Sequence, residues 1–397
     1  MTIGIFQDPI KKKQFFFSYT IFIINGMLAL SVGLLLPFVQ ESRNLSYAFA
    51  GLLVSLHSIG YLIASFTAGI LPAFLGRKKS ALFLNSALMI AFTLIAFVNG
   101  TVAIALAFTL TGVARGSTSN FCTTVINNLA PGIAWVINGL HAMFAIGAFT
   151  LPLLLTAITA SAPQNWIYLV YFMILMGGIS WLLYFLIPLE HDQVGPKAKE
   201  RLNFGFLKHP IFYLVIGTLF FYLCAEQGVI GWLVTYFRNT GLLSDALAQI
   251  MSSILWLMIL IGRLSTAWLS TKIAKGKLLL GMGVGLVIFF ILLMISTSGL
   301  GIVIGIMGFG LSMSGVYGTA VTYAGKLIQN YTMTWSFILT FASLGSITMP
   351  SVIGNVAERA GIAAGMSSIT IALILALIFI ISLLLYSKRQ EAITNLK

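Results

Sequence analysis

Twelve long apolar stretches fill most of this chain and leave only short polar segments between them. Each holds about 20 residues or more, enough for a helix rising 1.5 Å per residue to cross a hydrocarbon layer of about 30 Å. Charged residues make up 8% of the chain and hydrophobic residues 59%, whereas a soluble domain carries about 25% charged residues. The sequence therefore predicts an all-α membrane protein with 12 transmembrane helices. The expected helices cover residues 14–38, 46–70, 79–98, 101–125, 134–158, 166–188, 210–237, 244–270, 277–297, 299–325, 331–356 and 363–387.

Lysine and arginine give the chain a formal net charge of +13 at pH 7, but they lie in short clusters between the apolar stretches. Such clusters are typical of the cytoplasmic loops of membrane proteins, so they do not indicate nucleic-acid binding. With a cytoplasmic N-terminus, 17 of the basic residues fall in inner segments and three in outer ones. We therefore expect both termini in the cytoplasm and the chain in a bacterial inner membrane.

The sequence contains no signature of an enzyme or of a disulfide framework. The apolar stretch after Lys11-Lys12-Lys13 is too long for a cleaved signal peptide and long enough to span. Cys122 and Cys224 both lie within apolar stretches, without the spacing of a disulfide framework or a metal site. We expect neither catalytic activity nor a metal or cofactor.

A polar stretch at residues 191–209 divides the chain into near-equal halves, 1–190 and 210–397, and the halves resemble each other. With a shift of 198 residues, Gly147–Pro152 falls on Gly345–Pro350. Because each half has six spans, an even number, both insert in the same direction. This predicts a parallel repeat about an axis along the membrane normal, an architecture in which transporters hold their substrate near the middle of the membrane.

The segment Gly69–Lys79, which reads GILPAFLGRKK, lies between the second and third expected spans. It resembles the loop motif that the major facilitator superfamily carries at this place, although the family usually has Asp where Ala73 stands. The resemblance implies the 12-helix fold of that superfamily. It also implies a gating loop, made here by Gly69, Gly76, Arg77 and Lys78.

Three further segments are similar to the fucose/glucose permease group of that superfamily: Gly112–Asn120, Asn138–Gly147 and Tyr222–Tyr236. This resemblance implies uptake of a sugar driven by a proton or sodium gradient. The fucose permease carries acidic residues in its first and fourth spans. This chain has Asn25 and Arg115 as polar residues in those spans instead.

Glu226 is the one acidic residue of nine that lies in the middle of an expected span. An ionised carboxylate in hydrocarbon costs at least a few kcal/mol, so such a residue faces a cavity or a partner. Glu226 is therefore a candidate for proton coupling, with a structural ion pair as the alternative. Arg115 lies at a similar depth and is its expected partner. Arg115 could also bind an oxygen-rich substrate through its forked donors.

Seven other polar or aromatic residues in the spans are candidates for proton coupling or for binding a sugar through amides and an aromatic face. The alternative for each is packing or, for tyrosine and tryptophan, anchoring at the membrane surface. The candidates are His57, His141, Asn25, Asn120, Gln227, Trp232 and Tyr317.

Two functions are compatible with these features. The first is import of a sugar or related small polar solute, coupled to a proton or sodium gradient. The second is proton-driven efflux of drugs or other small molecules, because Gly147–Pro152 partly resembles the antiporter motif of the superfamily and the chain is rich in Phe (30) and Met (15). The expected partners are the solute, the coupling ion and the lipid bilayer, and we expect a monomer.

Overall fold

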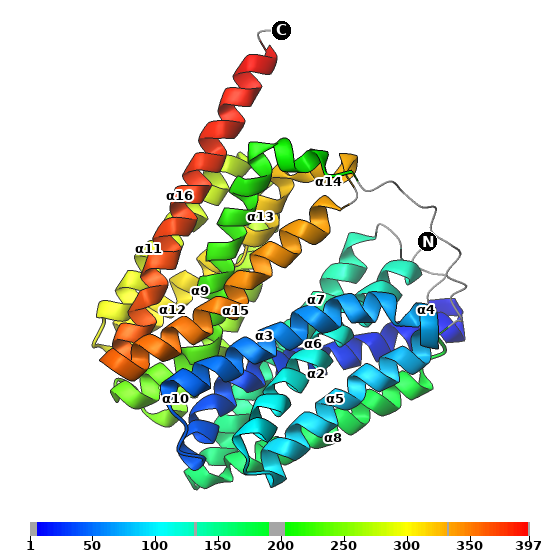
Figure 1. The fold of residues 1–397 in the computed structure, drawn as a ribbon, viewed down its shortest axis with the longest axis vertical. Helices are drawn as coiled ribbons and strands as arrows, with labels where there is room; N and C mark the ends of the chain where they lie inside the picture. The colour runs from blue at the N-terminus through cyan, green and yellow to red at the C-terminus, as the bar shows by residue number, and fades with distance from the viewer. Residues whose placement is uncertain (1–5, 131–132, 190–202, 332, 396–397) are drawn as a thin grey trace. The chain divides into compact units, whose positions relative to one another are not determined.

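The computed structural model describes residues 6–130, 133–189, 203–331 and 333–395, and helices dominate this part of the chain (Figure 1). Twelve of the described helices are long and apolar enough to cross a membrane, which confirms the all-α prediction. The helices of the first half are α2 (Pro9–Ser42), α3 (Tyr47–Ile70), α4 (Pro72–Leu75), α5 (Arg77–Phe97), α6 (Thr101–Leu129), α7 (Ala134–Thr159) and α8 (Trp166–Leu186). The helices of the second half are α9 (Pro210–Thr240), α10 (Asp245–Leu269), α11 (Lys275–Ile295), α12 (Gly299–Met313), α13 (Val316–Tyr323), α14 (Gly325–Asn330), α15 (Thr334–Ala360) and α16 (Ile362–Asn395).

The chain forms two compact units, which largely follow the two halves of the sequence. Unit 1 comprises Met1–Leu45, Leu52–Lys197 and Asp245–Ser253, and unit 2 comprises the remainder. Each unit thus includes the first turns of one helix, α3 or α10, whose later turns belong to the other unit. Most of the expected linker at 191–209 lies outside the described residues, and a short 3-10 turn at Gly205–Lys208 precedes α9.

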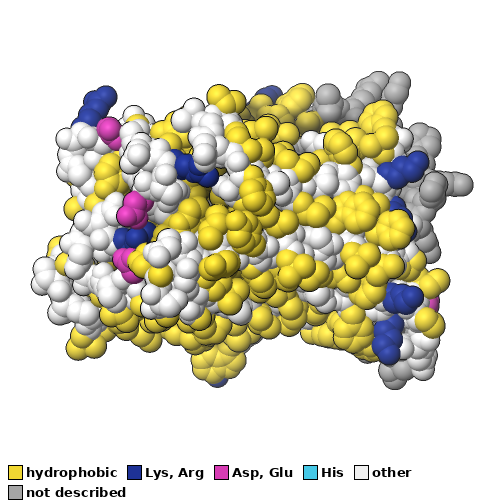
Figure 2. Space-filling view, turned by 90° about the horizontal axis from the view of Figure 1, so that it is seen from below, with side chains coloured by type: hydrophobic (Ala, Val, Ile, Leu, Met, Phe, Trp, Pro, Cys, Tyr) yellow, Lys and Arg dark blue, Asp and Glu magenta, His cyan; other side chains and the backbone are white. Residues whose placement is uncertain are grey.

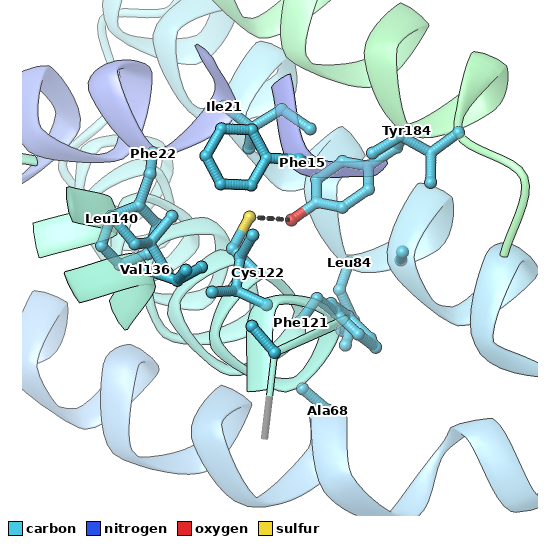
Figure 3. Close-up of a cluster of buried hydrophobic side chains, with 14 residues drawn as sticks. Phe15, Ile21, Phe22, Ala68, Leu84, Phe121, Cys122, Val136, Leu140 and Tyr184 are labelled. Atoms are coloured by element: carbon cyan, nitrogen blue, oxygen red, sulfur yellow. Dashed lines mark hydrogen bonds between the residues drawn. The ribbon is translucent and has the colours of Figure 1, made fainter. Parts of the chain in front are cut away.

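In unit 1, helix α2 packs against α7 and α6, while α5 packs against α6 and α8. In the most apolar 18-residue window of α2, 94% of the residues are buried inside the protein. This is expected for a helix that is hydrophobic on every side. Around it lies a cluster of buried side chains from several helices, drawn in Figure 3. There the sulfur of Cys122 lies 3.3 Å from the hydroxyl of Tyr184, so this cysteine is a packing residue.

In unit 2, α9 occupies the corresponding central position and packs against α16 and α15, while α11 packs against α12 and α16. The correspondence between the two units extends to individual contacts between pairs of helices. A Cβ atom at Gly112 would collide with the carbonyl oxygen of His57, and one at Gly310 would lie 2.9 Å from that of Leu255. Gly310 follows Gly112 by 198 residues, and Leu255 follows His57 by the same 198 residues, so the two contacts occupy equivalent places in the two halves. The repeat expected from the sequence is therefore present in the packing, where small residues let helices approach closely.

The tenth expected span, 299–325, is not one continuous helix. It is divided into α12, which ends at Met313, and α13, which begins at Val316. The stretch contains eight glycines, which weaken the helix. At one of them, Gly315, a Cβ atom would lie 2.5 Å from Thr266 and 2.7 Å from Met282. A side chain here would have to displace the side chains of Thr266 on α10 and Met282 on α11, so glycine suits the close packing where the helix is interrupted.

On the face of the molecule seen in Figure 2, hydrophobic side chains cover the middle of the helices, and charged side chains gather toward the helix ends. Large apolar residues such as Phe83, Leu264 and Ile371 are more than half exposed. A surface of this kind is stable against lipid tails and not against water. The chain is therefore a multi-pass membrane protein.

Candidate functional site

A chain of hydrogen bonds in unit 1 begins at Arg115 on α6 and runs through His57 on α3. Nη1 of Arg115 lies 3.4 Å from Nε2 of His57, and Nδ1 of His57 lies 2.8 Å from Oγ1 of Thr111. Arginine only donates, so Nε2 accepts and Nδ1 carries the proton. The hydroxyl of Thr111 in turn donates to the carbonyl of Phe108 at 2.6 Å. Both ring nitrogens of His57 are therefore used by a neutral imidazole.

The guanidinium of Arg115 is held from a second side by an aromatic ring. Its central carbon lies 4.9 Å from the centroid of the Tyr61 ring, one turn along α3 from His57. Such a cation–π contact is worth about 0.5–2 kcal/mol, more where water is excluded. His57 and Tyr61 together orient a half-buried cation whose planar fork matches carboxylate, phosphate or paired hydroxyl groups.

Two asparagines expected from the sequence lie in the same unit. Asn25 on α2 is buried, and its Nδ2 donates to Oγ of Ser119 at 3.0 Å. The Oδ1 atom of Asn25 is out of contact with solvent and has no hydrogen-bond partner among the described residues. Asn120 donates to the backbone carbonyl of Ser65 at 3.1 Å. Asn25 thus leaves a buried acceptor unsatisfied, a costly arrangement that a bound donor would relieve.

The single mid-membrane acid lies in a different cluster, in unit 2. Glu226 and Tyr222 are one helical turn apart on α9, and their side chains interact electrostatically. The hydroxyl of Tyr222 also donates to the carbonyl of Met313 at 3.1 Å, where α12 ends. The ring of Tyr317 on α13 lies 6.5 Å from that of Tyr222. The acid is therefore positioned beside the interruption between α12 and α13.

A basic residue on α10 also acts on this cluster. Arg263 on α10 lies close enough for its charge to act on Tyr222. It also lines a cavity of about 320 Å³ together with threonine and serine side chains. The internal repeat indicated that Arg263 lies at a functional position. With a shift of 202 residues, Arg263 corresponds to Tyr61, the residue that contacts Arg115.

The remaining candidates occupy different surroundings. Trp232 is completely buried, and its indole N–H donates to the carbonyl of Pro350 at 3.2 Å, which favours packing. His141 is exposed, with its ring 5.8 Å from that of Phe22. Gln227 is half-buried on α9 beside Glu226. The expected Arg115–Glu226 pair joins residues of different units and stays a prediction.

The segment expected to form a gating loop contains the short helix α4 and the turn that follows it. Gly76 has a φ of +78°, a conformation that favours glycine, and α5 begins at the next residue, Arg77. The ammonium of Lys78 lies 5.0 Å from the centre of the Phe185 ring. Nothing lies within 4 Å of the position that a Cβ of Gly69 would take. Within the described residues, no three His, Cys, Asp or Glu side chains are grouped so that they could hold a metal.

Similar proteins identify the fold and the family. One curated relative, the glucose/mannose transporter GlcP of Bacillus subtilis (strain 168), is 23% identical over 86% of this chain and 88% of its own length. The crystal structure of a mutant of the nucleoside transporter NupG has a TM-score of 0.78 at 14% identity, covering 94% of this chain and 99% of NupG. A bacterial homologue of the human lysosomal transporter Spinster has a TM-score of 0.73 at 13% identity, covering 95% and 97%. The model of the Major Facilitator Superfamily matches residues 15–350. The chain therefore belongs to the major facilitator superfamily and is a membrane transporter of small solutes.

Proposed function

We propose that this protein imports a hexose or a related polyhydroxy solute together with a proton, and that Glu226 carries the proton. The observation that carries the proposal is the position of Glu226, which lies mid-span on α9, one helical turn from Tyr222, whose side chain it influences electrostatically. The curated relative GlcP, a glucose/mannose transporter, supports a sugar as the solute.

The hydroxyl of Tyr222 has one proton, and this limits the state of Glu226. When Tyr222 donates to the carbonyl of Met313, its oxygen can only accept a hydrogen bond from Glu226, and only a protonated carboxyl group could donate one. When Glu226 loses that proton, the carboxylate accepts a hydrogen bond from the Tyr222 hydroxyl, and the carbonyl of Met313 loses the hydrogen bond from Tyr222. Protonation of Glu226 is thereby linked to the contact between α9 and the end of α12.

Arg263 is the second group that we propose to control the protonation of Glu226. In general, a nearby positive charge stabilises an ionised carboxylate, whereas apolar surroundings stabilise the neutral form. A carboxyl group held between two such opposing influences changes its protonation when either influence changes. A movement of α10 relative to α9 would therefore load or release the proton.

We propose two halves, 1–190 and 210–397, joined by a linker at 191–209, and each half offers groups that could bind a polar solute. Arg115, oriented by His57 and Tyr61, and the unsatisfied Oδ1 of Asn25 would bind hydroxyl groups from the first half. Gln227 and Tyr317 are the corresponding groups of the second half. Alternating exposure of such a site to the two sides of the membrane would carry the solute across.

We propose the orientation of the protein, its gating segment and its oligomeric state from its charge distribution and from this mechanism. Basic residues between the helices favour cytoplasmic termini in a bacterial inner membrane. The segment with Gly69, Gly76, Arg77 and Lys78 would control opening on the cytoplasmic side. We propose that the protein acts as a monomer, because each chain contains both halves, and that it catalyses no chemical reaction.

Counterflow in proteoliposomes tests the proposal. Vesicles loaded with unlabelled glucose or mannose should accumulate the labelled sugar, and an inward proton gradient should drive uptake without internal sugar. A protonophore should abolish this uphill uptake, whereas replacing sodium by choline should leave it unchanged. Uptake that follows sodium would replace the proton as coupling ion. If labelled hexoses never accumulate while ethidium-like cations leave loaded vesicles along a proton gradient, the protein is an efflux antiporter instead.

A further inference from the structure

Unit 2 contains a second site, at the ends of three of its helices and outside the Glu226 cluster. A cavity of about 570 Å³ lies between the start of α11, the end of α13 and the last turns of α16. Its volume is within the range of about 300–1,000 Å³ that is usual for ligand pockets. In Figure 1 the C-terminal turns of α16 extend beyond its neighbours in unit 2.

The charged residues that line this cavity are all lysines. Lys275 and Lys277 come from the first turn of α11, and Lys388 comes from α16. Three cations in one cavity repel each other unless an anion lies between them. The lining therefore has the charge that binds a phosphate group.

The backbone and one hydroxyl group add donors at the same place. Helix α11 begins at Lys275, and no side chain caps its first amide groups, which therefore present N–H donors and the positive end of the helix dipole. The hydroxyl of Ser387, also in the lining, is out of contact with solvent and has no hydrogen-bond partner among the described residues. A buried hydroxyl without a partner is costly, and rotation of the Ser387 side chain toward a bound phosphate oxygen would satisfy it.

The walls of the cavity are apolar and lie at the membrane surface. Leu280, Leu384 and Leu385 contribute to the lining, and Leu280 and Leu385 are 37% and 64% exposed. The helices meet closely, since a Cβ atom at Gly276 would lie 3.1 Å from Leu384 and 3.2 Å from the hydroxyl of Tyr323. The membrane-spanning part of α11 begins at Lys275 and that of α16 ends at Gln390. A ligand here would have an anionic head beside the lysines and hydrocarbon beside the leucines.

We propose that this cavity binds an anionic phospholipid such as phosphatidylglycerol. The phosphodiester lies among Lys275, Lys277 and Lys388, and the acyl chains lie along Leu280 and Leu385. Basic pockets between transmembrane helices bind anionic headgroups by this combination of charge and apolar wall. The proposal does not depend on the transported solute or on the coupling ion.

Lipid binding to the purified full-length protein tests the site, measured by native mass spectrometry from detergent micelles. Phosphatidylglycerol should be retained in preference to phosphatidylethanolamine, and added salt should weaken its binding. Lys275→Gln, Lys277→Gln and Lys388→Gln combined should lower the affinity on the order of 100-fold, since each lysine near an anionic surface contributes a factor of about five. The matched control combines Lys12→Gln, Lys13→Gln and Lys79→Gln, three exposed lysines at helix starts outside this cavity.

Two further measurements keep the result decisive if the triple variant folds poorly. Leu280→Trp leaves every charge in place but fills the apolar wall, and it should also weaken phosphatidylglycerol binding. Glycerol phosphate, which has the head without the acyl chains, should compete poorly. Equal lipid retention by the cavity variant and its control would overturn the proposal. Full competition by glycerol phosphate, or no effect of Leu280→Trp, would assign the cavity to a free phosphate compound rather than to a lipid.

Discussion

The hydroxyl of Tyr222 donates a hydrogen bond of 3.1 Å to the carbonyl of Met313, the last residue of α12. The final carbonyl groups of a helix have no partner within that helix. A side chain from α9 supplies the missing donor, and the same side chain lies one helical turn from Glu226 and interacts with it electrostatically. The relationship connects a membrane-buried acid to the place where the tenth span is interrupted.

Tyr222→Phe should destabilise the protein by about 1–3 kcal/mol, because it leaves the buried carbonyl of Met313 without a donor. The change should be measured as a lower melting temperature of the purified protein in detergent. Tyr213→Phe is the matched control: Tyr213 lies on the same helix, is 53% exposed and donates to the carbonyl of Leu207. Equal melting temperatures for the Tyr222 variant and the wild type would show that the bond contributes no stability.

Glu226→Gln should abolish accumulation of solute against its gradient and spare exchange of labelled for unlabelled solute. Glutamine keeps the size and a hydrogen-bond donor for Tyr222 but cannot release a proton. Glu358→Gln, at the exposed end of α15, should leave both activities intact. Both are measured in proteoliposomes with and without a proton gradient. Uphill uptake by the Glu226 variant equal to that of the wild type would exclude Glu226 as the proton carrier.

His57→Phe should raise the KM for the solute and lower stability by about 1–3 kcal/mol, because Arg115 and Thr111 each lose a buried partner. His57→Gln offers one acceptor and one donor, as the neutral imidazole does, and should restore much of both. In the Gln variant, the ratio of accumulated to external solute should still follow the proton gradient. If this variant exchanges solute but cannot accumulate it, His57 is the coupling residue.

Gly112→Ala should destabilise unit 1 by about 1–3 kcal/mol, because the new methyl group must displace the His57 carbonyl and separate α6 from α3. Gly281→Ala on α11 is the control, since no atom lies within 4 Å of its would-be methyl group. That control should be neutral or slightly stabilising, because alanine favours helix more than glycine does. Melting temperatures of the two variants in the same detergent make the comparison. A Gly112 variant as stable as the control would mean that the helices separate without cost.

The 12 helices could be predicted from the sequence because the membrane imposes a local rule. A segment that crosses hydrocarbon must satisfy its own backbone hydrogen bonds and must be apolar for about 20 residues. Both conditions are visible within one segment, without knowledge of its neighbours. The prediction fails at residues 314–315, where the helix is interrupted, because hydropathy does not register a break within an apolar stretch; the packing of Gly315 close to Thr266 and Met282 is visible only in the tertiary structure.

The sequence by itself determined the fold, the repeat and the identity of Glu226 as the single mid-span acid, since these follow from hydropathy and self-similarity. Only the tertiary structure decided the partners. His57 and Arg115 are 58 residues apart in sequence, and Tyr222 and Met313 are 91 apart. Both pairs depend on helix rotation and close approach. Hydropathy reports how apolar a helix is, whereas its rotation is set by side-chain packing against helices distant in sequence.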